Sequence, residues 1–279
     1  MNDLIIRSLS GIFYVGLIIL SLISSDAWLW GFILFSIFYF IQTDELIRLL
    51  RLDKISFFLM SVLFWLGIST GIIYSVFTRS FQLQWSIELV YFIAFVWILF
   101  IIFMIFSIIR TNLSAIFALF YLAIPFSLTL VILMIEPLLI LFLFFIIWIY
   151  DTFAYLTGRF FGKHKLAPAI SPKKTWEGVA GGMLAVIISV YLIWKYHLLT
   201  DYFYFLKDAE FSGLIPMLIL IIILATAGDL FESFLKRRAG VKDSGNIMPG
   251  HGGLLDRLDS YMFAITGFFF YLIFVFKLF

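Results

Sequence analysis

The stretch that organises this chain reads SFLKRRAGVKD from Ser233 to Asp243 and HGGLLDRLD from His251 to Asp259. It places five basic side chains, three carboxylates and a histidine in a chain that is otherwise mostly apolar. Clustered Lys and Arg suit a phosphate group, and clustered Asp suits Mg²⁺, which prefers oxygen ligands. Solvated charge beside a membrane would explain a basic run alone, but not regularly spaced Asp beside His-Gly-Gly. The stretch therefore predicts a binding or catalytic site.

The composition places this site in a membrane protein. Hydrophobic residues make up 64% of the 279 residues and charged residues 13%, and the mean hydropathy is +1.13. Apolar runs of about 20 residues recur, and each can cross a hydrocarbon core roughly 30 Å thick. Because a bilayer cannot hydrogen-bond the backbone, we expect helical spans and an all-α, polytopic integral membrane fold. The absence of cysteine excludes disulfides, thiolate ligands and a cysteine nucleophile.

Nine apolar segments predict about nine transmembrane helices. They cover roughly residues 6–23, 27–47, 56–77, 86–109, 113–134, 137–157, 177–195, 214–235 and 259–279. The segments within residues 1–134 form an N-terminal group of helices. Residues 135–279 form a catalytic transmembrane region, whose basic residues concentrate in loops 159–176 and 236–258.

The basic residues also predict the orientation. If the N-terminus is cytoplasmic, fifteen of the nineteen Lys and Arg residues fall on the cytoplasmic side, which positive charge favours. We therefore expect a protein of the inner or plasma membrane whose active site faces the cytoplasm. Asp44 and Glu45, at the cytoplasmic end of the second segment, are explained by solvation at a helix end.

A carboxylate lies inside the sixth segment. Asp151 occurs in the sequence WIYDTFAY, about two helical turns before Arg159. An intramembrane carboxylate is costly, and by default it faces a partner, a cavity or an ion. A hydrogen bond to a neighbouring helix is the structural alternative, and we favour a functional role.

Two lysines precede the seventh segment in the sequence SPKKTWEG at 171–178. Thr175 is a suitable helix N-cap, and Glu177 falls in the first turn. Lys173 and Lys174 therefore lie just before a helix N-terminus, where free N–H groups and the macrodipole favour an anion. The pattern is only moderately specific, because lysines occur in many cytoplasmic loops.

Two helix faces carry acids at i, i+3 spacing, Asp229 with Glu232 and Asp256 with Asp259. Joined by a glycine-rich basic loop, these faces can converge on a cation near the membrane surface. Mg²⁺ usually takes only one or two carboxylates, so we predict Asp229 and Asp256, from different helices, as direct ligands. Glu232, Asp259 and Asp151 are predicted as supporting or secondary ligands, with room for a second cation.

At these residues the chain resembles the CDP-diacylglycerol synthases (phosphatidate cytidylyltransferases). Their signature reads Ser-x-apolar-Lys-Arg, four residues, Lys-Asp, a small-residue stretch, and then His-Gly-Gly-apolar-x-Asp-Arg-apolar-Asp. Ser233 to Asp259 follows it almost position for position, with Met248 where the pattern usually has Leu, Ile or Phe. The 171–178 motif and the Asp151 segment are also similar to the family. The N-terminal half resembles it only in having several apolar spans.

The resemblance implies that CTP and phosphatidic acid give CDP-diacylglycerol and pyrophosphate, for phospholipid biosynthesis, with Mg²⁺ required. It implies membrane lipids as the surroundings and no nucleic acid as a partner, and it leaves a homodimer open. The residues implied as catalytic are Asp151, Lys173, Asp229, Lys236, Arg237, His251 and Asp256. Those implied as substrate-binding are Ser171, Lys174, Ser233, Lys242, Asp243, Gly252, Gly253 and Arg257.

Phosphate chemistry gives these residues their expected roles. The clustered lysines and arginines are expected to neutralise the triphosphate and the lipid phosphate. The attacking phosphate is already ionised near neutral pH, so we expect His251 to orient a phosphate or the loop rather than act as a base. Catalysis should then rest on positioning and charge neutralisation.

Two other classes of protein remain open. A cation- or proton-coupled transporter would also place carboxylates in membrane spans, but it does not need a glycine-rich loop with Lys, Arg and His-Gly-Gly. A lipid-binding scaffold could use basic loops for anionic headgroups, but it does not need buried acids.

Overall fold

Eight long α-helices make up most of the described part of the chain. The computed structural model describes residues 2–81, 113–198, 203, 206 and 210–276. The helices are α1 (Asn2–Ile23), α2 (Ala27–Leu50), α3 (Lys54–Phe81), α5 (Leu113–Ile135), α6 (Pro137–Phe161), α7 (Trp176–Lys195), α9 (Phe211–Ala239) and α10 (Leu255–Tyr271). One π-helical turn, η1 (Leu272–Phe276), continues α10.

The all-α prediction is confirmed, whereas the count of nine spans is not. Each described helix coincides with one predicted segment, and the segment 86–109 lies outside the described residues. Six described helices are long and apolar enough to cross a membrane, on length and composition alone. They are α1, α5, α6, α7, α9 and α10, the last together with η1. In α3, a shorter apolar stretch covers Lys54–Gly67.

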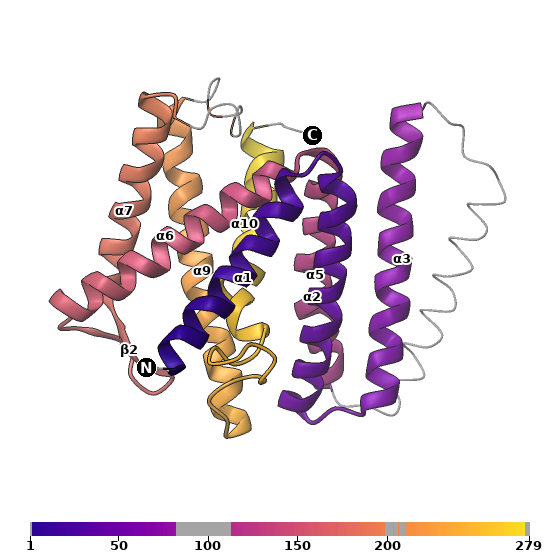
Figure 1. The fold of residues 1–279 in the computed structure, drawn as a ribbon, viewed down its shortest axis with the longest axis horizontal. Coiled ribbons are helices and arrows are strands. Elements are labelled where there is room, and N and C mark those ends of the chain that lie inside the picture. The colour runs from indigo at the N-terminus through magenta and orange to yellow at the C-terminus, as the bar shows by residue number, and fades with distance from the viewer. Residues whose placement is uncertain (1, 82–112, 199–202, 204–205, 207–209, 277–279) are drawn as a thin grey trace.

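The connections gather at two opposite ends of the bundle. In Figure 1 the N-terminus, the C-terminal end of α9 and the loop that leads to α10 lie at the lower end. The α2–α3 connection lies at the same end. The short turn between α1 and α2, the C-terminal end of α7 and the start of α9 lie at the upper end. Strand β2 (Ser171–Thr175), in the loop before α7, also lies at the lower end in Figure 1, so the two basic loops predicted to form a site share one end of the molecule.

A β-hairpin interrupts the otherwise helical fold, and the sequence analysis did not predict it. Strand β1 (Lys165–Ala167) pairs antiparallel with β2 (Ser171–Thr175) inside the predicted loop 159–176. The side chain of Glu177 holds the base of the hairpin, because it accepts hydrogen bonds from the Lys163 and His164 backbone N–H groups at 3.1 and 3.2 Å. The predicted N-cap is confirmed, since Thr175 Oγ1 accepts a hydrogen bond from the Gly178 N–H at 3.2 Å.

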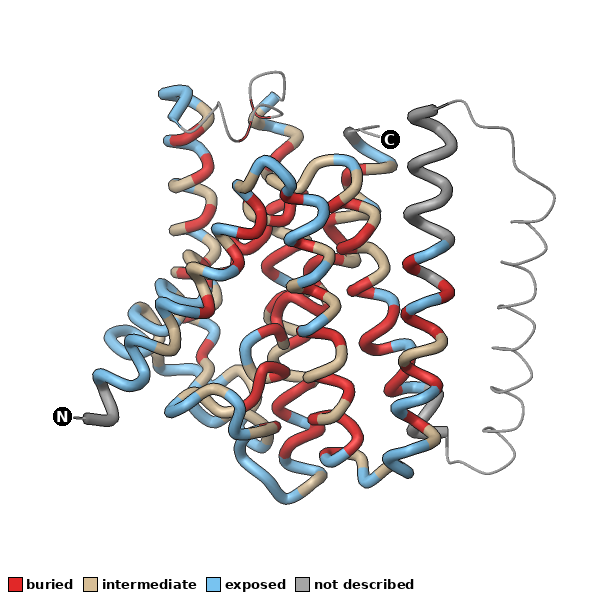
Figure 2. The backbone as a smooth tube through the Cα atoms, turned by 45° about the vertical axis from the view of Figure 1, so that its right-hand side comes forward, coloured by how far each residue is buried: buried red, intermediate tan, exposed pale blue. Residues whose placement is uncertain are grey.

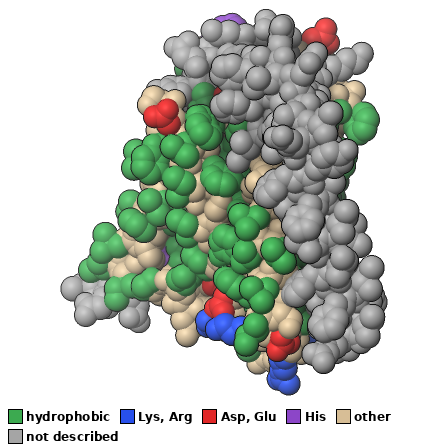
Figure 3. Space-filling model, turned by 90° about the vertical axis from the view of Figure 1, so that its right-hand side faces the viewer, with side chains coloured by type: hydrophobic (Ala, Val, Ile, Leu, Met, Phe, Trp, Pro, Cys, Tyr) green, Lys and Arg blue, Asp and Glu red, His purple; other side chains and the backbone are tan. Residues whose placement is uncertain are grey.

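Buried residues concentrate in the central helices, as Figure 2 shows. The rings of Phe144 on α6 and Tyr261 on α10 stack with centroids 4.7 Å apart. The Tyr261 hydroxyl lies 2.6 Å from Thr129 Oγ1 on α5, which ties a third helix to the same point. Hydrophobic side chains cover the middle of the face drawn in Figure 3, with Lys and Arg at its lower edge. This distribution suits a bundle whose middle contacts lipid tails.

Two glycines bring the site-bearing helices close together. A Cβ atom at Gly182 on α7 would lie 2.7 Å from the Tyr150 ring, so α7 packs closely against α6. A Cβ atom at Gly228 on α9 would lie 2.5 Å from the Asp259 carbonyl oxygen, so α9 packs closely against α10. Small residues at helix contacts permit this approach in membrane proteins. The second contact places Asp229 beside the acidic face of α10.

Candidate functional site

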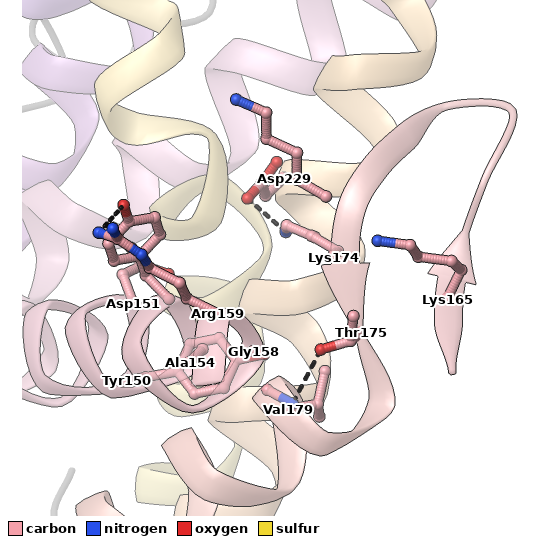
Figure 4. Close-up of a pocket in the computed structure, with 13 residues that line it drawn as sticks. Tyr150, Asp151, Ala154, Gly158, Arg159, Lys165, Lys174, Thr175, Val179 and Asp229 are labelled. Atoms are coloured by element: carbon pink, nitrogen blue, oxygen red, sulfur yellow. Dashed lines mark hydrogen bonds and ion pairs between the residues drawn. The ribbon is translucent and has the colours of Figure 1, made fainter. Parts of the chain in front are cut away.

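A basic cavity of about 560 Å³ opens between α6, the hairpin, α7 and α9. Its charged lining comes from Asp151 and Arg159 on α6, Asp229 on α9 and three lysines of the hairpin. Figure 4 shows the Lys174 side chain directed toward Asp229 across the cavity and Lys165 on the neighbouring strand. The lysines are Lys165, Lys173 and Lys174. Of the four basic residues that line the cavity, Lys173 and Lys174 were predicted from the sequence as site residues, whereas Lys165 and Arg159 were not.

Lys174 forms an ion pair with Asp229, so the hairpin is linked to α9 by opposite charges. Ser233 Oγ donates to Asp229 Oδ1 at 3.3 Å from the next turn of the same helix. Ser171 begins β2, where its partner in the strand pairing is Ala167. The sequence analysis predicted the anion-binding position of the lysines, but it did not predict that one of them meets a carboxylate of another helix.

Four carboxylates from three helices interact electrostatically, and two of them, Asp151 and Asp229, line this cavity. Asp259 on α10 lies in the field of Asp229 and Glu232 on α9 and of Asp151 on α6. Asp151 in turn lies in the fields of Asp229 and Lys174. Like charges held together repel, so this cluster favours a cation in or beside it. The structure thus brings Asp151 to the two acidic faces predicted on α9 and α10.

A second cavity, of about 230 Å³, meets the same cluster from the side of α1. Asp151, Asp256 and Asp259 line it together with apolar residues of α1 and α6. His251 and Arg257 also line it. Asp151 therefore borders both cavities, one rich in lysine and the other combining apolar side chains with ionisable ones.

Asp256 organises the glycine-rich loop before α10. Its Oδ2 accepts hydrogen bonds from the Gly253 N–H at 2.8 Å, and from the N–H and the hydroxyl of Ser244, both at 2.9 Å. Gly252 has a φ of +88°, and a Cβ atom there would lie 2.7 Å from Asp256 Oδ2. The loop therefore requires glycine at this position for two reasons, the left-handed backbone and the close carboxylate.

Lys236 has a different environment from the one predicted for it. We expected it to neutralise a substrate phosphate, but only 9% of the residue is exposed. Its Nζ lies 2.5 Å from Glu232 Oε2 and 2.6 Å from Asp256 Oδ1. The side chain of Glu232 is fully buried, and its Oε1 has no hydrogen-bond partner among the described residues. Lys236 thus balances two carboxylates of the protein itself.

His251 connects the loop to the first helix. Its Nδ1 lies 2.7 Å from Ser10 Oγ on α1, and its carbonyl oxygen accepts a hydrogen bond from Arg257 Nη2 at 3.1 Å. Burial, with the Arg257 and Arg7 guanidinium groups nearby, lowers the pKa of His251 below its usual value. A neutral imidazole at neutral pH agrees with a role in orienting the loop.

Three other predicted residues lie on the exposed surface. Arg237 is exposed near the end of α9 and donates from Nη1 to the Val241 carbonyl oxygen at 3.1 Å. Lys242 and Asp243 are exposed in the loop that follows. Among the described residues that line the two cavities, none of these three is present.

The prediction for the acids of α2 is right for one and wrong for the other. Asp44 is solvated in part and pairs with Arg48 and Lys54. Glu45 is only 4% exposed and accepts hydrogen bonds from the loop before α10. Consecutive helical residues point about 100° apart, so one acid faces water while the next faces the protein. No spacing pattern in the sequence distinguishes the two.

The chemistry of the acidic cluster fits Mg²⁺, although a formed coordination site is not present. Among the described residues, no group of three or more His, Asp or Glu side chains is placed to hold a metal ion. Carboxylates from α6, α9 and α10 nevertheless interact electrostatically, and Glu232 Oε1 has no hydrogen-bond partner in the described part of the chain. Hard oxygen donors of this kind are those that Mg²⁺ prefers. Asp229 and Asp256 form ion pairs with Lys174 and Lys236, respectively.

Comparisons with known proteins agree on one family. A family model described as the cytidylyltransferase family matches residues 5–276. Phosphatidate cytidylyltransferase from Haemophilus influenzae is 40% identical over 137 residues, which cover 49% of this chain and 46% of that protein. The enzyme of the same name from Thermotoga maritima is 44% identical over 117 residues, 42% of each chain. That from Staphylococcus haemolyticus is 45% identical over 129 residues, 45% of each chain. The matched stretch thus spans slightly less than half the length of these relatives.

Proposed function

This chain belongs to the cytidylyltransferase family, and we propose that it transfers a cytidylyl group from CTP to phosphatidic acid, giving CDP-diacylglycerol and pyrophosphate. The observation that carries the proposal is the position of Asp151, which borders a lysine-rich cavity and a second cavity that combines apolar side chains of α1 and α6 with Arg257 and His251. A reaction between a water-soluble triphosphate and a membrane lipid needs two such environments to meet at one point.

The basic cavity suits the triphosphate of CTP. Its volume of about 560 Å³ lies within the usual range for small-molecule sites, roughly 300–1,000 Å³. Three lysines and Arg159 supply positive charge around it. The lysines of β2 also lie just before the N-terminus of α7, where backbone N–H groups and the macrodipole favour an anion.

The smaller cavity suits the phosphate of the lipid. It combines apolar side chains of α1 and α6 with Arg257 and His251 at the end of the bundle where the loops gather. An anionic headgroup there would have its acyl chains beside the apolar helices. Its phosphate would lie next to the acidic cluster, across from the lysines.

The chemical step follows from these two positions. A phosphate oxygen of phosphatidic acid attacks the α-phosphorus of CTP and forms a new P–O bond. The bond between the α-phosphorus and the bridging oxygen breaks, and pyrophosphate leaves with the electron pair. The protein holds the two reacting groups in line and neutralises the charge on the leaving group. Lys173, Lys174 and Lys165 are placed for the second task.

Asp229 and Asp256 would hold Mg²⁺, supported by Asp151, Glu232 and Asp259. When bound, the ion supplies positive charge that neutralises phosphate oxygens and helps to align them. The Lys174 ammonium group beside Asp229 would then be free to move toward phosphate, while Lys236 stays between Glu232 and Asp256. The number of carboxylates leaves room for a second cation.

We propose further that the protein is integral to the bacterial membrane with the site on the cytoplasmic side. Bacterial relatives, and six helices within the described ranges that are long and apolar enough to span, support the membrane location. The bias of Lys and Arg toward one set of connections supports the orientation. The prediction of nine spans with an external C-terminus belongs to the same proposal.

The direct test uses purified protein in detergent with labelled CTP, phosphatidic acid and Mg²⁺. We expect labelled lipid product from the wild type and from Asp44→Asn, whose residue lies outside both cavities. Asp229→Asn keeps the size of the side chain and removes its charge, so it should fold normally and lose activity by orders of magnitude. Ion flux in liposomes without lipid product would instead indicate a transporter. Lipid binding without turnover would indicate a scaffold.

A further inference from the structure

Glu45 makes contacts unlike those of an acid at a solvated helix end. It lies in the last two turns of α2, in the N-terminal half of the chain. Its Oε1 accepts a hydrogen bond from the Leu254 N–H at 2.9 Å. Its Oε2 accepts one from the Leu255 N–H at 2.7 Å and lies 3.2 Å from the Ser244 hydroxyl, whose single proton is shared with Asp256 Oδ2. Three donors from one distant segment thus converge on a single buried carboxylate.

Two of these donors belong to the first turn of α10. The first N–H groups of an α-helix have no partner within the helix. The residue at the N-cap, Leu254, has no side chain that can accept from them. Glu45 therefore caps α10 from a different helix. Its negative charge also suits the positive end of the α10 macrodipole.

The third donor links Glu45 to an acid of the proposed site. The Ser244 hydroxyl stands between Glu45 Oε2, at 3.2 Å, and Asp256 Oδ2, at 2.9 Å. The loop fits around Glu45 because it has glycine on both sides. A Cβ atom at Gly245 or Gly253 would lie 2.5 or 2.6 Å, respectively, from Glu45 Oε1. The glycines and the carboxylate therefore form one fitted contact.

We infer that Glu45 is a positioning residue of the proposed active site. It fixes the start of α10, and through it the places of Asp256 and Asp259 relative to the acids of α9. Glu45 acts through these residues and lines neither the lysine-rich cavity nor the smaller cavity beside α1. The inference rests on the proposed function, and it assigns a role in the site to a helix of the N-terminal half.

Hydrogen exchange tests the contact without reference to catalysis. Glu45→Gln keeps the shape of the side chain but replaces one acceptor oxygen with an NH₂ group, which cannot accept from the loop. Deuterium uptake in a peptide that covers residues 243–256 should become at least about tenfold faster in this variant, the change expected for one lost hydrogen bond to a charged group. Asp44→Asn, the adjacent control, should exchange like the wild type. Equal uptake in Glu45→Gln and wild type would overturn the inference.

The dependence of turnover on Mg²⁺ tests the effect on the site. We expect Glu45→Gln to need at least about tenfold more Mg²⁺ for half-maximal activity, with Asp44→Asn unchanged. A purely structural role would lower the amount of active protein and leave this concentration the same, and that result would overturn the inference.

A second variant covers the case in which Glu45→Gln does not fold. Ser244→Ala removes only the hydroxyl that stands between the two acids, so it should raise the Mg²⁺ requirement in the same direction by a smaller factor. An unchanged requirement in Ser244→Ala would then overturn the inference. If the wild type makes no lipid product, the proposed function fails and the catalytic part of the inference fails with it. Wild-type turnover with a normal Mg²⁺ requirement in the variants refutes the inference alone.

Discussion

Replacing Lys236 by methionine should destabilise the protein more than any other single change at the charged end of α9. The residue is 9% exposed and its ammonium lies 2.5 Å from Glu232 and 2.6 Å from Asp256. Methionine keeps most of the apolar volume and removes the charge. Breaking a buried ion pair by removing one partner typically costs about 3–5 kcal/mol, because it leaves an uncompensated buried charge.

The two acids should not contribute equally to this cost. Asp256 keeps three hydrogen bonds from Ser244 and Gly253 after the lysine is removed. Without Lys236, the fully buried side chain of Glu232 has no hydrogen-bond donor among the other described residues. Most of the loss should therefore come from Glu232. The double variant Lys236→Met/Glu232→Gln should recover most of the stability, to within about 1–2 kcal/mol of the wild type.

Thermal unfolding in detergent, followed by intrinsic tryptophan fluorescence, measures both variants. A change of 1 kcal/mol shifts the midpoint by roughly 2–4 °C in a chain of this size range, so the single variant should unfold roughly 6–20 °C below the wild type. An unchanged midpoint in Lys236→Met would refute the assignment of Lys236 as an internal counter-ion. A double variant no more stable than the single one would refute the dominant role of Glu232.

The remaining predictions concern the basic cavity, the loop and the topology. Lys173→Ala should cut turnover or raise the apparent KM for CTP by about tenfold or more. Lys54→Ala, outside both cavities, should have wild-type kinetics. Equal kinetics in the two variants would contradict the assignment of the lysine-rich cavity to CTP. Gly252→Ala and Gly240→Ala both place a Cβ at positive φ, but only the Cβ at residue 252 would meet a carboxylate. Gly252→Ala should therefore lower the stability measured by unfolding clearly more than Gly240→Ala does, and equal losses of stability would contradict the close contact. A single cysteine at Ser212 should react only with reagent added outside the membrane, and labelling from the cytoplasmic side would contradict the proposed orientation.

The helices could be predicted from hydropathy because a bilayer requires long apolar runs, but their ends could not. The prediction ended the eighth segment at residue 235, whereas α9 continues through the basic run to Ala239. The helix ends where Gly240 adopts a φ of +76°, a turn that glycine permits. Likewise, α10 begins at Leu255, four residues before the predicted segment. Hydropathy marks the apolar boundary, while capping geometry ends the helix.

The candidate site was predictable as a set of residues but not as a set of contacts. Spacing along a helix indicated that Asp229 shares a face with Glu232, and its position inside an apolar segment made Asp151 notable. Nothing in the sequence relates Lys174 to Asp229 or Glu45 to the α10 N-terminus, because these partners are brought together only by helix packing. The hairpin was missed for a different reason, because its three- and five-residue strands are short and carry no clear alternation.

The Glu232–Lys236 pair has a consequence for how the protein enters the membrane during synthesis. The two residues are four apart on α9, so their opposite charges can meet as soon as that helix forms. Asp256 emerges from the ribosome 20 residues after the lysine and reaches it only when α10 docks. The insertion machinery therefore receives α9 with this part of its charge already neutralised, which reduces the cost of passing ionised groups into lipid. The ion pair between Lys236 and Asp256 then forms only after α10 has packed against α9.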